Sequence, residues 1–259
     1  MPIWEWDKIP GTTSRDYPSD SGATIQKEWG IEGSTRFSGG VSDGLYGASA
    51  YDLDHDGVKA KKAWFFFDRE VVCLGAGISS DAEEHITTTI NQSWLRGNVL
   101  TDTTGNKTRI VHDSIVYYVA QDEEVKLTQQ TQSGSWYRIN QFQPKNSRAG
   151  KVFKLWIDHG QKPKNATYAY TVVPKANLNK PTKNEMDMIK ILKNTEDVQA
   201  VKHTGLDMLQ VVFYKAGALT AHNLYLKVDN PCVVYIKSLH TAEPILYIAD
   251  PSHENANIK

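Results

Sequence analysis

The chain has 259 residues, with 29 basic side chains against 30 acidic ones and a formal net charge of −1. This length can bury a sizeable core, and the balanced charge gives the molecule no general attraction for nucleic acid or for a membrane surface. No stretch of the sequence is long and apolar enough to span a membrane. We therefore expect neither nucleic acid nor membrane as a partner, and any polyanion must be bound by a local basic patch.

The N-terminal segment, about residues 1–35, is predicted to be irregular. Pro2, Pro10 and Pro18 interrupt any helix or central strand there. The opening MPIWEWDKIPG has neither the basic start nor the apolar core of a signal peptide. We therefore expect no signal peptide in this sequence, and the compartment is not indicated by the residues themselves.

Residues 37–77 form the most apolar and most frequently interrupted part of the chain. The runs AWFFFD (63–68) and VVCL (71–74) are rich in aromatic and β-branched residues and are separated only by Arg69 and Glu70. This pattern predicts a β-hairpin whose strands are covered on both faces. Cys73 and Cys232 lie inside apolar runs, which favours two buried free thiols over a disulfide.

Beyond residue 39 short apolar segments alternate with turn signals, which predicts an all-β, mostly antiparallel sandwich. One helix is expected at Asn184–Leu192, where Asn184 would cap it. The segment from Val198 to Gln210 is ambiguous between strand and helix. The expected strands cover residues 45–53, 63–68, 70–76, 85–91, 109–112, 115–119, 125–128, 137–142, 152–158, 168–173, 209–214, 224–228, 232–237 and 245–249.

The motif DLDHDG at residues 52–57 matches the first half of a calcium-binding loop, with carboxylates at Asp52, Asp54 and Asp56. The twelfth position of such a loop would be Ala63, which has no oxygen to offer. An ordinary hairpin turn is the preferred interpretation, and calcium at the three aspartates stays open as an alternative. No other metal or cofactor is expected, and nucleophile and nucleotide-binding motifs are missing.

Several long strings resemble one known family. GGVSDGLYGASAYDLD, AKKAWFFFDREVVCLGAGI and ITTTINQSW are similar to the central β-domain of polysaccharide lyase family 8, as are WDKIPGTTSRDY and FKLWIDHGQKPKNATYAYTVVP. Within the family the resemblance is to the chondroitin AC lyases, with the hyaluronate lyases more distant. It implies a large antiparallel β super-sandwich like that of galactose mutarotase, with few short helices. Residues 1–259 would form one central domain, and the helical catalytic toroid domain would be absent from this chain.

The resemblance also implies which residues face the substrate. The family's catalytic tetrad takes a His, a Tyr and an Arg from the helical domain and a Glu from an EGS-type loop, which Glu32-Gly33-Ser34 matches. Glu32 is expected to orient the Arg and His. Other side chains are expected to contact the sugar chain. An indole ring can stack on the apolar C–H face of a sugar, an amide can hydrogen-bond to hydroxyl groups, and a cation attracts sulfate or carboxylate. These expected substrate contacts are Trp94, Thr35, Asn91, Gln92, Arg36 and Lys61; at Thr35 the family often has Asn.

The parent protein is thus expected to be a secreted or periplasmic lyase that cleaves chondroitin sulfate or hyaluronan by β-elimination. Its partners would be the glycosaminoglycan and an N-terminal helical domain of the same protein. The first alternative is a stand-alone carbohydrate-binding module without catalysis. The second is a mutarotase-type sugar epimerase, for which no motif places the required carboxylate and His together.

Overall fold

The computed structural model describes residues 2–17, 33–138, 140, 142–175, 187–221 and 224–254. Within these ranges the regular elements are antiparallel β-strands and two 3-10 helices, and Asp187 and Met188 form a short piece of helix. None of the helices there is long and apolar enough to cross a membrane. The elements are η1 (Trp6–Lys8), β1 (Thr13–Arg15), β2 (Ser38–Ser42), β3 (Gly47–His55), β4 (Val58–Phe66), β5 (Val71–Ser80), β6 (His85–Trp94), β7 (Leu100–Thr104), β8 (Lys107–His112), β9 (Ile115–Ala120), β10 (Val125–Gly134), η2 (Trp136–Arg138), β11 (Arg148–Gln161), β12 (Ala166–Val173), β13 (Ile189–Asn194), β14 (Val198–His203), β15 (Met208–Phe213), β16 (Gly217–Ala221), β17 (Leu224–Val228), β18 (Cys232–Lys237) and β19 (Ile245–Ala249).

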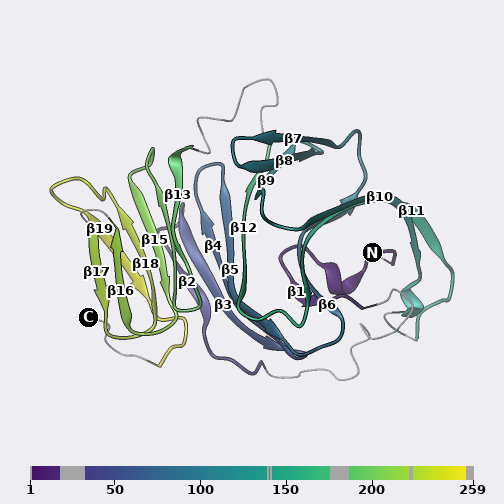
Figure 1. Cartoon of the computed structure of the whole chain (residues 1–259), viewed down its shortest axis with the longest axis horizontal. Coiled ribbons are helices and arrows are strands. Elements are labelled where there is room, and N and C mark those ends of the chain that lie inside the picture. Colours follow the sequence, from purple (N-terminus) through teal and green to yellow (C-terminus); the bar gives the residue numbers. More distant parts are fainter. Residues whose placement is uncertain are drawn as a thin grey trace.

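In the described part of the chain the strands form four stacked layers (Figure 1). An eight-stranded sheet, ordered β2-β3-β4-β5-β12-β9-β8-β7, lies in the middle. A four-stranded sheet, β1-β6-β11-β10, packs on one of its faces, and a five-stranded sheet, β13-β14-β15-β18-β19, packs on the other. The ribbon β16-β17 covers the outer face of the five-stranded sheet. This arrangement confirms the expected antiparallel super-sandwich.

The eight-stranded sheet is buried on both faces. Phe65 and Leu74 belong to the core shared with the five-stranded sheet, whereas Cys73 belongs to the core shared with the four-stranded sheet. The predicted hairpin is confirmed, because β4 pairs with β5 from Phe66 opposite Val71 onward. Successive side chains of a strand point to opposite faces, so a strand covered on both faces is mainly apolar, as β5 is from Val71 to Ile78.

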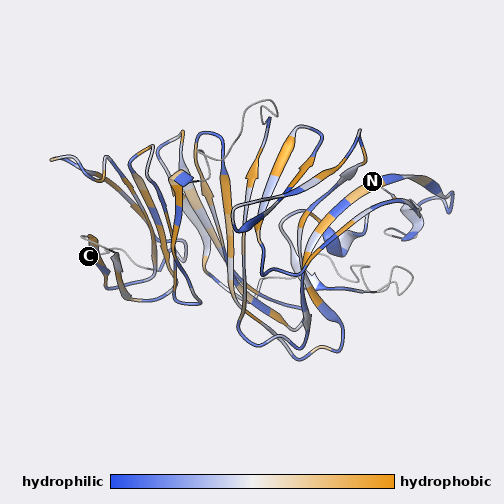
Figure 2. Cartoon of the chain, turned by 45° about the horizontal axis from the view of Figure 1, so that its top comes forward, coloured by the Kyte–Doolittle hydropathy of each residue, from blue (hydrophilic) through white to orange (hydrophobic). Residues whose placement is uncertain are grey.

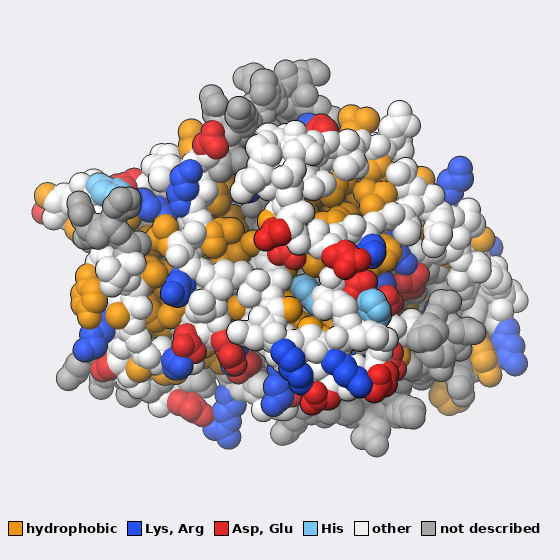
Figure 3. All heavy atoms as spheres, in the orientation of Figure 1, with side chains coloured by type: hydrophobic (Ala, Val, Ile, Leu, Met, Phe, Trp, Pro, Cys, Tyr) orange, Lys and Arg blue, Asp and Glu red, His pale blue; other side chains and the backbone are white. Residues whose placement is uncertain are grey.

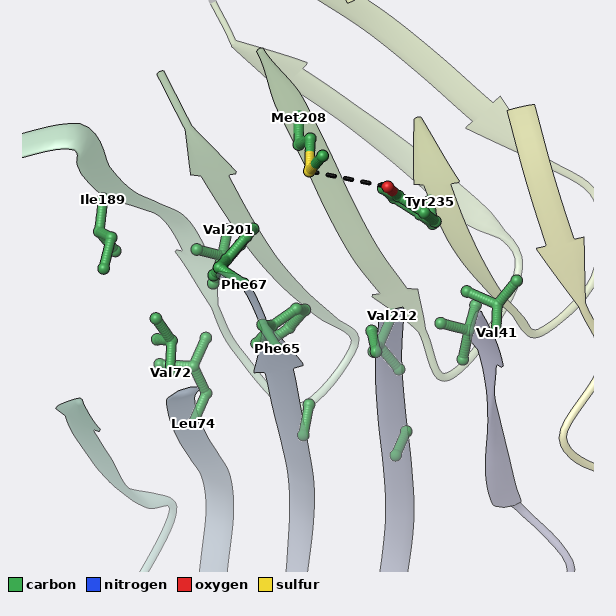
Figure 4. Close-up of a cluster of buried hydrophobic side chains, with 14 of the residues drawn as sticks. Val41, Phe65, Phe67, Val72, Leu74, Ile189, Val201, Met208, Val212 and Tyr235 are labelled. Carbon is green, nitrogen blue, oxygen red and sulfur yellow. Dashed lines mark hydrogen bonds between the residues drawn. The ribbon is translucent and has the colours of Figure 1, made fainter. Parts of the chain in front are cut away.

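The core between the eight-stranded and five-stranded sheets joins the two halves of the sequence (Figure 4). Phe65 and Val72 from β4 and β5 face Val201 and Val212 from β14 and β15, and all four side chains are fully buried. Burying side chains of this size stabilises by about 1.5–3 kcal/mol each. The five-stranded sheet therefore packs as an integral layer of the sandwich.

The outer face of the five-stranded sheet forms a third core with the ribbon. Leu209 and Phe213 in β15 are buried against Leu219 in β16 and Val228 in β17. Apolar residues concentrate along the strands, while the turns that join them are mostly hydrophilic (Figure 2). Both cysteines are buried and free, as the sequence indicates.

The predicted helix at Asn184–Leu192 is wrong in its C-terminal part: Asp187 and Met188 are helical, but the chain continues as a strand from Ile189. Residues 189–192 lie in β13, which pairs antiparallel with β14 from Ile189 opposite His203; Asn184 itself lies outside the described residues. Ile189 is buried in the core between two sheets, so tertiary pairing decides the conformation of a segment whose local pattern favours a helix. The ambiguous segment 198–210 is strand, with β14 turning into β15.

Two further expectations need correction. The strand predicted at residues 137–142 is not present at its start, because β10 ends at Gly134 and η2 occupies Trp136–Arg138. The N-terminal segment is less irregular than predicted, since it contains η1 and the short edge strand β1. Both errors come from short segments whose structure depends on a neighbour in space. The remaining predicted strands all overlap observed ones.

Candidate functional site

Glu32, the expected catalytic residue, lies outside the described residues, but the segment that follows it is defined. The hydroxyl of Ser34 donates to the main-chain oxygen of Asp54, and the hydroxyl of Thr35 donates to that of Asp52. The main-chain nitrogen of Asp52 in turn donates to Phe37 O at 2.9 Å. Residues 34–37 therefore run beside β3, toward its C-terminal end. The Thr35 hydroxyl is engaged in this structural bond.

Arg36 is the most exposed of the expected substrate contacts. Its side chain is 83% exposed, and its guanidinium lies 2.8 Å from Glu254 near the C-terminal end of the described chain. An exposed ion pair of this kind contributes little to stability, about 0–1 kcal/mol. The guanidinium is therefore accessible to an anionic ligand, which among the described residues would compete with Glu254 for it.

Lys61 is paired across the β3–β4 hairpin. Its ammonium lies 2.6 Å from Asp52, which is its direct cross-strand neighbour, and 5.5 Å from the centre of the Tyr214 ring. Lys59 is placed in the same way, 3.3 Å from Asp54. The positive charges of Lys59 and Lys61 are thus balanced by aspartates on the same hairpin, which weakens their attraction for a polyanion.

The aspartates of the DLDHDG motif lie on a hairpin turn. Asp56 and Gly57 both have positive φ, 52° and 73°, as a two-residue hairpin turn requires. Asp56 accepts hydrogen bonds from Arg15 at 3.3 Å and from the phenol of Tyr17 at 2.5 Å. With Lys61 and Lys59 on the other two aspartates, every carboxylate of the motif has a cation or a hydrogen-bond donor of the chain as its partner. No group of three metal-binding side chains is found among the described residues.

Lys62 follows Lys61 in β4 but is buried, unlike Lys59 and Lys61. Its side chain is only 3% exposed, and its ammonium donates to the main-chain oxygen of Gly11. Burial lowers the pKa of Lys62 to about 7. This lysine therefore attaches the N-terminal segment to β4.

Trp94 ends β6 and lies against a neighbouring glycine. A Cβ atom added at Gly150 in β11 would come within 2.2 Å of Cζ3 of the indole, so only glycine leaves room for the ring in this position. The residue is still 40% exposed. One part of the indole therefore packs on β11, and the other part is exposed to solvent.

The two amides beside Trp94 are used within the protein. Asn91 donates to the phenol of Tyr117. Gln92 is 1% exposed; its amide nitrogen donates to Glu5 O at 3.0 Å and Lys8 O at 2.8 Å, and its amide oxygen accepts from Glu5 N at 3.1 Å. The expected substrate contact of Gln92 is therefore wrong: a buried amide with three bonds to the N-terminal segment fixes that segment in place.

The structure separates the expected site residues into two groups. Arg15 pairs with Ile86 near the beginning of β6 and contacts Asp56 at the β3–β4 turn, so residues 34–36 lie near that end of β6. Trp94 lies at the other end, eight residues further on, or roughly 25 Å away at about 3.3 Å per residue. One sugar unit cannot touch both groups, whereas an extended polysaccharide can.

The face of the molecule in Figure 3 has no single sign of charge. Acidic and basic side chains are interspersed over it, as the ion pairs on the β3–β4 hairpin lead one to expect. His159 forms a hydrogen bond with the Thr88 hydroxyl at 2.8 Å. Burial lowers the pKa of His159 to about 4, so it is neutral in the folded protein at pH 7.

The layered antiparallel sheets form a β super-sandwich. Comparison with known proteins makes this specific: the model of the polysaccharide lyase family 8 super-sandwich domain matches residues 1–185, and the model of the family's C-terminal β-sandwich domain matches residues 190–259. The chain belongs to polysaccharide lyase family 8. The two models divide the chain between residues 185 and 190, whereas the sequence predicts a single domain over residues 1–259; the two parts share a core.

Individual relatives agree with this assignment. The chain is 49% identical to chondroitinase-AC of Pedobacter heparinus over 97% of its own length, and it spans 37% of that protein. A solved chondroitinase AC lyase, from a study of its oligosaccharide complexes, superimposes with a TM-score of 0.91 at 48% identity, covering 98% of this chain and 39% of that one. Chondroitin AC lyase of Streptomyces coelicolor A3 in complex with chondroitin sulphate gives 0.85 at 26% identity, covering 99% and 34%.

Proposed function

We propose that this chain forms one wall of the substrate cleft in a lyase that cleaves uronic-acid-containing glycosaminoglycans of the chondroitin or hyaluronan type. The observation that carries the proposal is the similarity to chondroitinase AC, 49% identity over nearly the whole chain together with a TM-score of 0.91. The chain spans less than two-fifths of those relatives, so we assign the activity to a longer protein. The family resemblance implies that this protein also contains a helical domain.

The reaction is a β-elimination. A base removes the C5 proton of a uronic acid, the glycosidic oxygen leaves with a proton, and an unsaturated uronide remains. The C5 proton becomes acidic enough only when positive groups or hydrogen-bond donors neutralise the adjacent carboxylate. By the family resemblance, Glu32 orients the Arg and His that perform these steps from the helical domain, and does not take the proton itself.

The described residues next to Glu32 suit this role. Residues 34–37 are attached to β3 by hydrogen bonds, and β3 is part of the doubly covered central sheet. A loop held by a rigid sheet can present a carboxylate with little positional freedom, which is what an orienting group requires. Arg36 and the exposed part of Trp94 would hold the polysaccharide at two separate points.

The substrate also bears on where the protein acts. Glycosaminoglycans are long, highly charged chains that do not cross a lipid bilayer, because moving their charges into hydrocarbon is prohibitively costly. The proposal therefore places the protein outside the cytoplasm, as a secreted or periplasmic enzyme.

The test replaces the matching part of Pedobacter heparinus chondroitinase-AC with this chain and follows chondroitin cleavage by the ultraviolet absorbance of the new double bond. We expect the chimera to be active and the isolated chain to show no turnover. A folded chimera without activity would overturn the proposal. Activity of the isolated chain close to that of the chimera would overturn the role as a wall, and binding without any turnover in either protein would favour the carbohydrate-binding module.

A further inference from the structure

The far end of the β10–β11 hairpin extends beyond the cores that hold the sheets together. We call the described residues between 131 and 151 the hairpin tip. Most of them are exposed, whereas β11 is buried at Val152 and Phe153, immediately after the tip. In Figure 1 the hairpin reaches the right-hand edge of the molecule, away from the central sheet.

The hairpin is strongly basic, although the basic and acidic residues of the whole chain are nearly equal in number. Residues 125–157 contain six Lys or Arg residues and no Asp or Glu, although the whole chain has a net charge of −1. Two of these lysines have carboxylate partners, Lys126 with Glu124 at 2.6 Å and Lys154 with Glu5 at 2.5 Å. The others, all in the hairpin tip, make no ion pair within the part of the chain that the structure describes. They are Arg138, Lys145, Arg148 and Lys151.

Aromatic side chains lie among these cations. Phe142 is 98% exposed and Trp136 is 44% exposed, although both would gain by burial. The ammonium of Lys145 lies 4.6 Å from the centre of the Tyr137 ring. A phenylalanine side chain in water is less stable than one covered by an apolar surface. The exposure of Phe142 on a basic tip therefore points to a ligand with an apolar face.

The turn that presents Phe142 is held by its own hydrogen bonds. The main-chain nitrogen of Phe142 donates to the Asn140 side chain at 2.9 Å, and Asn140 N donates to Trp136 O at 2.8 Å. Gly134 packs so closely on the N-terminal segment that an added Cβ would lie 2.1 Å from Pro2 O. The base of the tip is therefore fixed to the body of the protein, and the aromatic side chains are presented from a defined turn.

We propose that the hairpin tip binds a stretch of anionic polysaccharide, with Trp136 and Phe142 against the sugar rings and Lys145 and Arg148 on sulfate or carboxylate groups. Sugar rings have apolar C–H faces that stack on aromatic rings, and their sulfate and carboxylate groups take cations as partners. The inference rests on the proposed function for the class of ligand, and the charge of the tip agrees with that class.

The position of the tip defines what it does. The tip lies at the Trp94 end of β6, roughly 25 Å along that strand from residues 34–36. A chain held at the tip is therefore several sugars away from the reacting uronic acid. The tip retains long polymers, and short oligosaccharides do not reach it from the site next to Glu32.

Calorimetric titration of the 259-residue chain with polymeric chondroitin sulfate tests the tip directly. We expect Trp136→Ala, Phe142→Ala and the pair Lys145→Ala with Arg148→Ala each to weaken binding about three- to tenfold. Matched controls on the ribbon, Tyr225→Ala and Lys227→Ala, should bind like the unaltered chain; Tyr225 is 67% exposed. Unchanged binding in all three tip variants, with unchanged melting temperatures, would overturn the proposal.

Two further measurements separate this proposal from the others. In the active chimera, the tip variants should raise KM for the polymer several-fold and leave cleavage of a tetrasaccharide unchanged; equal effects on both substrates would overturn the tip as a distant contact. If the chimera is inactive, the proposed function fails while titration still decides the role of the tip. Binding of polyglutamate or RNA as tight as that of chondroitin sulfate, with no loss in Phe142→Ala, would show a general polyanion surface and overturn sugar stacking.

Discussion

The phenol of Tyr214, just after β15, donates a hydrogen bond to the main-chain oxygen of Lys62 in β4 at 2.9 Å. The same oxygen of Tyr214 lies 2.7 Å from the Gln199 side chain, and Gln199 donates to Lys61 O at 3.3 Å. These bonds join the five-stranded sheet to the central sheet next to the register shift between Lys59 and Lys61. Side chains from the part of the chain matched by the second family model thus donate to main-chain oxygens of the central sheet beside this irregularity.

Removing this phenol should destabilise both parts of the chain together. Tyr214→Phe keeps the ring packed on Phe37, whose centre lies 5.1 Å away, and deletes only the hydroxyl. We expect the free energy of unfolding in urea to fall by about 1–3 kcal/mol in a single transition, because a buried carbonyl loses its donor. Tyr225→Phe on the exposed ribbon is the control and should stay within about 0.5 kcal/mol. Two separate transitions would contradict the shared core.

Gly150 should be required for the position of Trp94. Gly150→Ala places a methyl group within 2.2 Å of the indole, so either the ring leaves β11 or the strand shifts. We expect a loss of about 1–3 kcal/mol in stability. The double variant with Trp94→Ala should recover most of that loss, since the clash is then gone. If the two changes are simply additive in chemical denaturation, the indole does not lie on Gly150.

His159 should make the folded chain sensitive to mild acid. Its folded pKa is lowered to about 4 by burial, with Asp158 opposing the shift, whereas an unfolded histidine titrates near 6.5. The unfolded chain therefore binds the proton first, and stability that is complete above about pH 6.5 is lost as the pH falls toward 4, by up to about 1.4 kcal/mol per pH unit. Urea titrations from pH 7 to 4 should show a shallower decline in His159→Gln. The exposed His55→Gln should decline like the unaltered chain, and an equal change in both variants would refute this assignment.

Glu32 should matter for turnover and not for stability. Glu32→Gln is expected to change the unfolding free energy of the isolated chain by less than about 0.5 kcal/mol. In the active chimera it should lower kcat about a hundredfold or more with KM nearly unchanged, the pattern of a group that acts mainly in the transition state. Glu254→Gln, which removes the exposed partner of Arg36, is the matched control. A loss of stability without a loss of kcat would assign Glu32 a structural role.

The sequence predicts the central sheet because that part of the fold follows from local patterns. β4 and β5 carry continuous aromatic and β-branched runs, and the turn at Asp56-Gly57 has the residues that positive φ requires. β13 could not be predicted in this way. Its Ile-Lys-Ile-Leu pattern is compatible with a helix, and only pairing with β14 and burial of Ile189 make it a strand.

The candidate site could be predicted only in part. The family resemblance points to Glu32 and Trp94. No local pattern shows that the Gln92 amide forms three hydrogen bonds to the N-terminal segment. Nor does a run of lysines reveal that Lys62 is buried while Lys61 is paired with Asp52. These outcomes depend on which segments meet in space, and the residues involved are up to 87 positions apart in the sequence.

Because the eight-stranded sheet has a core on each side, both faces of its middle strands are packed, and substitutions on either face disturb a core. A change at Cys73 disturbs one core and a change at the next residue, Leu74, disturbs the other. New binding properties can therefore arise only at the rim, in the turns and strand ends that project from the layers. Diversification among such chains should be concentrated in the loop around Gly33 and in the hairpin tip, while the interior strands keep their residues.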